Sequence, residues 1–232
     1  MNTISDWEII KNGFDFSYLL ELVSAVIPSL ICITLHELSH GLVAYALGDD
    51  TAKRAGRLTL NPLRHLDPIG LLMMLTVHFG YAKPVPVNMY RFKNPKRGMA
   101  LTALAGPGSN VVITVVFLFL YGALYRPLEG SAVGRSVLEL LLLTANISMG
   151  YAVFNMLPVP PLDGSKVLFS LLDEGSYRQL MRYERYGGIL LMALVWSGVL
   201  GRPLSLAIRW LFTQLLPVTQ WGWDFVNMIF YR

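Results

Sequence analysis

The chain has 232 residues, of which 54% are hydrophobic and only 15% are charged. Soluble domains have about a quarter of their residues charged, so this composition excludes an ordinary soluble protein and indicates an integral membrane protein. The net charge of +4 does not indicate a nucleic-acid partner, because the basic residues lie between apolar runs, where they set orientation in a membrane. The single cysteine, Cys32, excludes an intrachain disulfide.

The first 16 residues lack the basic region of a signal peptide, so we expect none to be cleaved. A membrane-crossing helix needs about 20 mostly apolar residues. Runs of this kind are predicted at 18–47, 99–125 and 137–157, with a shorter one at 186–200. A last region, 204–230, is broken by Pro217 and carries tryptophans that suit the membrane interface. These runs predict an all-α polytopic membrane protein with about five to six transmembrane helices.

The segment 66–80 is apolar but too short for an ordinary span, and basic residues flank it on both sides. We expect a membrane-embedded hairpin, which is tolerated where protein or a water-filled cavity satisfies its backbone. The stretches on either side, 56–61 and 83–87, have the pattern of short β-strands, and prolines restrict the second to a sheet edge.

Basic residues also set the expected topology, because they favour the cytoplasmic side. Both flanks of the hairpin and the loop 164–185 are predicted to lie in the cytoplasm, with the N-terminus outside the cell. The chain is expected to be a multi-pass protein of the plasma membrane, with its site towards the cytoplasm. Residues 1–232 are predicted to form one domain, with a core at 18–175 and C-terminal helices at 186–230.

The sequence His36-Glu37-Leu38-Ser39-His40 is an H-E-x-x-H motif inside the first apolar run. On a helix, residues four apart share a face, so both imidazoles can reach one metal ion while Glu37 stands beside it as a general base. Zinc binds such neutral nitrogen donors and keeps a position open for water. Ionisable groups at membrane depth indicate function, although a buried polar cluster that joins two helices would also satisfy the pattern.

A third metal ligand is required, and the candidates are Asp163, His65, His78 and several carboxylates. Asp163 follows a proline-rich stretch, Pro158-Val-Pro-Pro-Leu-Asp163, whose irregular backbone must line a cavity if it lies at membrane depth. It also stands at a predicted helix start, where an aspartate commonly caps the helix. Spacing alone leaves the two roles open.

Five motifs together resemble the site-2 protease family of intramembrane zinc metalloproteases, in its short prokaryotic branch without PDZ or CBS domains. They cover about residues 18–175, and occur in this order: His36–His40, the run from Gly56 to Pro62, the run from Lys83 to Asn88, Ala105-Gly-Pro-Gly-Ser-Asn110, and the run from Phe154 to Gly164. Gly108 departs from the bulkier apolar residue that the family usually has there.

The resemblance implies one zinc ion per chain, bound by His36, His40 and Asp163, with Glu37 as the catalytic base. It implies further that Asn155 is catalytic, by holding the substrate backbone or the developing oxyanion. The implied substrates are transmembrane proteins, cut within or near their membrane segments in regulated intramembrane proteolysis. The expected partners are these substrates and the lipid bilayer; a homo-oligomer is compatible with the sequence.

Two other functions use the same residues differently. In a metal-ion transporter, the three ligands would pass an ion rather than hold it, and a glutamate between two ligands would have no particular use. In a non-proteolytic scaffold, the helices would retain partner proteins without cutting them. Tight zinc binding and cleavage distinguish a protease from both.

Overall fold

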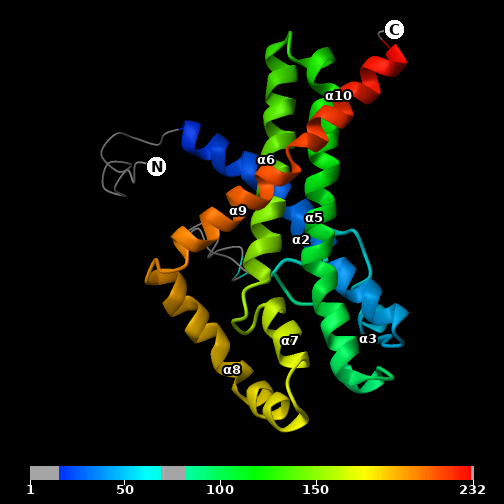
Figure 1. The fold of residues 1–232 in the computed structure, drawn as a ribbon, viewed down its shortest axis with the longest axis vertical. Coiled ribbons are helices and arrows are strands. Elements are labelled where there is room, and N and C mark those ends of the chain that lie inside the picture. The colour runs from blue at the N-terminus through cyan, green and yellow to red at the C-terminus, as the bar shows by residue number, and fades with distance from the viewer. Residues whose placement is uncertain (1–15, 69, 71–81, 231–232) are drawn as a thin grey trace.

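The computed structural model describes residues 16–68, 70 and 82–230, and the regular secondary structure of this part of the chain consists of helices (Figure 1). This confirms the predicted all-α class. The long helices are α2 (Phe16–Ala46), α5 (Pro95–Leu128), α6 (Ala132–Asn155), α8 (Glu174–Trp196), α9 (Gly201–Leu215) and α10 (Pro217–Phe230). The short ones are α3 (Thr51–Arg54), α7 (Asp163–Ser170) and two 3₁₀ turns, η1 (Pro62–Arg64) and η2 (Met89–Arg91).

Helix α5 is the centre of the fold, and α2, α6, α7 and α10 all pack against it. Figure 1 shows α5 and α6 side by side, with α2 crossing them and α10 lying along the far half of α5. Leu118, Ala145 and Val218 form a buried cluster where α5, α6 and α10 meet. The crossing of α2 with α5 and α6 lies at the opposite half of the bundle, and it positions the polar residues described below.

Three described helices are long and apolar enough to cross a bilayer: Ser24–Ala46 within α2, Pro95–Leu128 and Ala132–Asn155. A fourth span results if Tyr186–Trp196 and Gly201–Phe230, which meet at 88°, are taken as one broken span. The expected five to six spans are therefore not found in this part of the chain. The reason is that α8 begins in a charged stretch and that the C-terminal region breaks at Pro217 into helices shorter than the about 20 residues a span needs.

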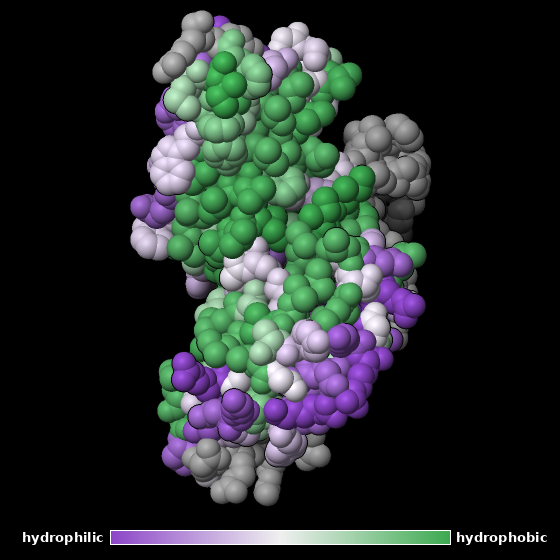
Figure 2. Space-filling view, turned by 90° about the vertical axis from the view of Figure 1, so that its right-hand side faces the viewer, coloured by the Kyte–Doolittle hydropathy of each residue, from purple (hydrophilic) through white to green (hydrophobic). Residues whose placement is uncertain are grey.

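The surface is divided between apolar and polar ends. Figure 2 shows hydrophobic side chains over most of one face and hydrophilic side chains gathered at the lower end, where α3 lies in Figure 1. Exposed basic residues of that end include Lys53, Arg54 and Arg97. This separation is the pattern of a protein that sits in a bilayer with one charged end in water.

The two predicted strands are not formed. Within the described residues, β pairing is limited to one isolated antiparallel bridge between Leu66 and Ala82. Pro84 and Pro86 have no N–H to donate to a ladder, and side chains take the groups that remain: Arg57 donates to the carbonyl of Lys83, and Glu37 accepts from the N–H of Val85. Most of the predicted hairpin 66–80 lies outside the described residues.

Candidate metal centre

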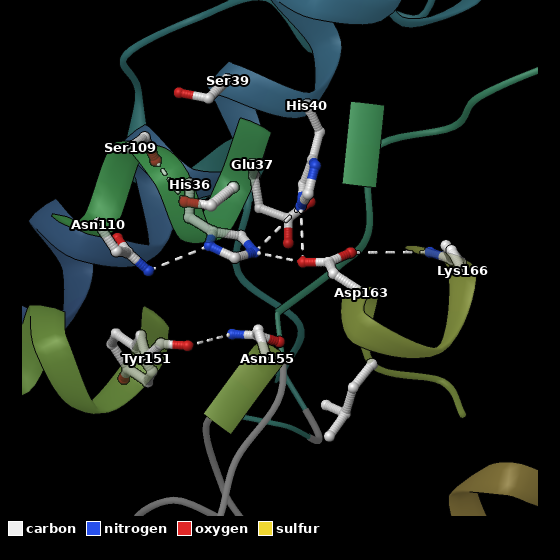
Figure 3. Close-up of polar contacts among 12 residues, drawn as sticks. His36, Glu37, Ser39, His40, Ser109, Asn110, Tyr151, Asn155, Asp163 and Lys166 are labelled. Atoms are coloured by element: carbon white, nitrogen blue, oxygen red, sulfur yellow. Dashed lines mark hydrogen bonds and ion pairs between the residues drawn. The ribbon is translucent and has the colours of Figure 1, made fainter. Parts of the chain in front are cut away.

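Helix α2 places two histidine rings together. His36 and His40 lie one helical turn apart, so their side chains project from the same face. Both are buried, and their Nε2 atoms are 3.0 Å apart (Figure 3). The helical prediction for this motif is thus confirmed, and the two rings point towards the first turn of α7.

Asp163 reaches the same point from the other side. Helix α6 ends at Asn155, the prolines that follow prevent its continuation, and α7 begins at Asp163 itself, with Leu162 at the N-cap. The turn packs so closely that a Cβ on Gly164 would lie 2.2 Å from the carbonyl oxygen of Met156. Because Leu162 occupies the N-cap position, the carboxylate of Asp163 does not cap α7. Its Oδ2 lies 3.2 Å from Nε2 of His36 and 3.1 Å from Nε2 of His40.

The spacing of these three atoms fits a metal ion. Zinc–ligand bonds of about 2.0–2.1 Å in a tetrahedral arrangement set the ligand atoms about 3.3 Å apart, close to the three distances above. Among the described residues, His36, His40 and Asp163 are the one group of three such side chains that could hold a metal ion, and all three are buried. Two imidazoles and a carboxylate, with a fourth position left for water, are the donors that zinc prefers in catalytic sites.

Space for the ion comes from a glycine of α5. A Cβ on Gly106 would lie 2.4 Å from Nε2 of His40 and 2.6 Å from Nε2 of His36, the atoms that would face the metal. Any larger residue at this position would enter the space that the ion needs.

Each imidazole also has a partner for its other nitrogen. Nδ1 of His40 lies 2.7 Å from the carbonyl oxygen of Thr102, to which it donates, so that the lone pair of Nε2 is free for a metal. Nδ1 of His36 lies 3.0 Å from the side-chain nitrogen of Asn110, whose Oδ1 is buried without a partner among the described residues. The two ends of an amide group have nearly the same shape, so a half-turn of the side chain exchanges its nitrogen and oxygen. With its oxygen towards His36, Asn110 would accept the Nδ1–H that a metal-bound imidazole carries, and both groups would be satisfied.

Asp163 is held in its charged form. Burial alone would raise the pKa of this carboxyl, but the two imidazoles beside it, His36 and His40, outweigh burial and lower the pKa below its ordinary value. Lys166, one turn along α7, places its Nζ 3.9 Å from Oδ1. The charged carboxylate is the form that binds a metal.

Glu37 lies beside the three ligands and faces a cavity of about 1630 Å³. The cavity is lined mostly by apolar side chains of α2, α6, α8 and α9, among them Ile33, Phe154, Leu191 and Trp196. Oε2 of Glu37 accepts a hydrogen bond of 2.9 Å from the backbone N–H of Val85. An acidic group thus stands in an apolar cavity next to a candidate metal position.

The other predicted residues lie in several places. Asn155 lines the same cavity, but its side-chain nitrogen donates to the carbonyl of Tyr151 one turn back, at 3.0 Å, rather than to the three ligands (Figure 3). His65 is buried away from the cluster, with Nε2 2.9 Å from the carbonyl oxygen of Thr59. Cys32 is buried near Thr144 and does not belong to the candidate metal group. His78 lies outside the described residues.

Sequence reasoning missed four contributions: the space left by Gly106, the contact of Asn110 with His36, the carbonyl of Thr102, and the N–H of Val85. The motif Ala105-Gly-Pro-Gly-Ser-Asn110 was the available signal for the first two, because Gly106 and Asn110 are four residues apart and so lie about one helical turn apart on one face of α5. The backbone groups of Thr102 and Val85 leave no mark in the sequence.

Comparisons with known proteins agree with this geometry. Residues 120–198 match the family model described as "Peptidase family M50". Two of the similar curated proteins are each named "Putative zinc metalloprotease": YwhC of Bacillus subtilis is 36% identical over 80% of this chain and 83% of its own length, and Rip2 of Mycolicibacterium smegmatis is 29% identical over 84% and 75%. No solved structure shows significant similarity to the chain.

Proposed function

Because the chain belongs to peptidase family M50, the site-2 proteases, we propose that it hydrolyses peptide bonds within or near the transmembrane segments of other membrane proteins. Membership and the apolar helices make it a multi-pass membrane metalloprotease with zinc as its cofactor. Our proposal goes beyond this family assignment in two respects: cleavage occurs at membrane depth, and individual residues have the roles given below.

One observation carries the proposal. The cluster of His36, His40 and Asp163, with Glu37 beside it, opens into a cavity that lies among apolar helices rather than into a polar surface groove. Two of the ligands come from α2, which contains a candidate span. The third comes from the start of α7, just after α6, which is a second candidate span. A peptide that reaches this cavity must come from an apolar environment, and a transmembrane segment is such a peptide.

His36, His40 and Asp163 would hold the ion through Nε2, Nε2 and Oδ2. When bound, zinc supplies Lewis acidity, which makes a water more acidic and polarises the scissile carbonyl. Glu37 takes the proton of the attacking water and returns it to the leaving amine. The mostly apolar lining of the cavity lowers the local dielectric, which strengthens these electrostatic interactions.

Asn155 is proposed to bind the substrate backbone or the developing oxyanion. Its side chain lines the cavity, and among the described residues its hydrogen-bond partner is a carbonyl of its own helix. Such a bond within one helix exchanges readily for a substrate contact. We further propose that the N-terminus lies outside the cell and that the site faces the cytoplasm, because the hydrophilic end carries the basic residues.

The proposal is tested by finding the bond that is cut. Purified protein is reconstituted in liposomes with a panel of single-span fusion proteins, and the products are sequenced by mass spectrometry. We expect cuts inside the apolar segment or at its cytoplasmic edge. Cuts confined to soluble loops, equally efficient in substrates without a membrane segment, would contradict intramembrane cleavage while leaving a membrane metalloprotease.

A further inference from the structure

The side chain of Glu37 is held in place by the backbone of a distant segment. Its Oε2 accepts a hydrogen bond of 2.9 Å from the N–H of Val85, which lies 48 residues further along the chain. Glutamate has three rotatable side-chain bonds, and a general base works only within hydrogen-bond reach of the proton that it removes. No other hydrogen bond joins the Glu37 carboxylate to a described residue, so within this part of the chain Oε1 has no competing protein donor.

The donor is isolated by its neighbours. Residues 83–88 read Lys-Pro-Val-Pro-Val-Asn, and proline has no N–H. Val85 therefore supplies the single backbone donor between Lys83 and Val87. The two prolines also restrict the backbone to extended conformations, so little conformational freedom is lost when the segment is ordered beside the site.

Both ends of the segment are anchored. The N–H of Lys83 donates to the carbonyl of His65 at 2.9 Å, and the N–H of Asn88 donates to Oδ2 of Asp49 at 2.6 Å. Asp49 is fully buried at the end of α2, the helix that carries Glu37. The Val85 side chain is itself 8% exposed, so the donor between the two anchors has a fixed position relative to α2.

We propose that Val85 is the positioning residue of the catalytic base, with its backbone N–H fixing one carboxylate oxygen of Glu37 so that the other faces the attacking water. The inference rests on the proposed function. It assigns to the backbone of this segment a role in the chemical step, distinct from binding the metal or the substrate.

The test compares two proline variants. V85P removes the N–H that donates to Glu37. V87P introduces the same restriction of the backbone dihedral angle two residues away, and it removes an N–H that donates to no described residue. Both are reconstituted with a single-span fusion protein that the wild type cuts, and kcat, KM as substrate mole fraction, and zinc per chain are measured. We expect V85P to keep one zinc and a KM within about threefold of wild type, and to lose about tenfold or more in kcat, with V87P within about threefold in both constants.

Equal kcat values for the two variants would overturn the inference. A rise in KM alone would do so too, since it would mean that the segment aligns substrate, and loss of zinc from V85P would assign it to the metal site instead. If V85P does not fold, α-hydroxyisovalerate at position 85 replaces the N–H by an ester oxygen, keeps the valine side chain, and is held to the same expectation. An inactive wild type would count against the proposed function itself, so the two failures are distinguishable.

Discussion

Gly106 faces Nε2 of His40 so closely that a single methyl group on the glycine would lie 2.4 Å from that nitrogen. Two helices from different parts of the chain therefore meet at a point where only hydrogen fits, and the space so defined lies against both imidazoles. A glycine in a helix interior costs about 0.5–1 kcal/mol relative to alanine. A glycine at this position of α5 is explained if the space beside it is used, and we propose that a metal ion occupies it.

This contact predicts a sharp difference between two neighbouring glycines. G106A should lose zinc, falling well below one ion per chain, because its Cβ enters the metal position. G108A is the matched control: it lies two residues along the same helix, is exposed, and a Cβ there would meet nothing within 4 Å. Metal analysis of both purified variants decides the matter, and equal zinc content in the two would show that the space near Gly106 is not the metal position.

The amide of Asn110 predicts an effect on zinc affinity. N110A should weaken binding by about 10–100-fold, the usual effect of removing the partner of a metal-bound histidine. N110D should restore affinity to near the wild-type value, because a carboxylate oxygen accepts the same Nδ1–H. Thr114 and Ser148 bond to the backbone carbonyl of residue 110 and are unaffected by either change. Competition with a chelator measures the affinities, and equal values for N110A and wild type would be the contrary result.

Asp49 accepts the N–H of Asn88 at the end of the segment 83–88. Its buried carboxylate predicts that the stability of the protein depends on pH. Burial alone would raise the pKa of Asp49, but hydrogen bonds from the Thr51 hydroxyl and from the N–H groups of Asn88 and Thr51 outweigh it and lower the pKa below its ordinary value. The charged form is therefore favoured by folding. The contribution of Asp49 to the free energy of unfolding is complete above its pKa in the unfolded chain, about 3.9. It is lost as pH falls through its lower pKa in the folded protein.

D49N removes that charge at every pH. At pH 7 we expect the variant to be less stable than wild type by about 1.5–3 kcal/mol, the range for hydrogen bonds to a charged group. The difference should shrink as pH falls below about 4. Thermal unfolding of zinc-free protein in detergent, from pH 7 to pH 3, measures it without a contribution from metal loss. A difference that stays constant over this range would mean that the charge of Asp49 does not matter.

The local part of the site could be predicted from sequence, whereas the distant part could not. Helical periodicity alone puts His36 and His40 on one face, with Glu37 beside them. Asp163 is more than a hundred residues away, and its spacing left metal binding and helix capping equally open; the family resemblance favoured the first, and the structure places Leu162, not Asp163, at the cap. Asn110 and Val85 contact the motif across 74 and 48 residues, and no local pattern reports such contacts.

The errors of prediction have a common cause. Alternation at 56–61 and at 83–87 suggested strands, but a ladder needs backbone groups that are free to pair, and here Arg57 and Glu37 take them. The count of spans was too high because charge at the start of α8 and the break at Pro217 leave apolar helices that are too short, and because Tyr186–Trp196 and Gly201–Phe230 meet at 88°. In both cases side chains and breaks, rather than hydrophobicity, decided the outcome.

The most direct test of the central claim pairs zinc content with cleavage in wild type and E37Q. Glutamine keeps the size of Glu37 and cannot accept the proton, so the ligands should be undisturbed while the chemical step fails. We predict about one zinc per chain in both proteins, with cleavage of a single-span substrate by wild type and a rate at least about 100-fold lower in E37Q. Cleavage by E37Q at the wild-type rate, or the absence of zinc from both proteins, would contradict the account.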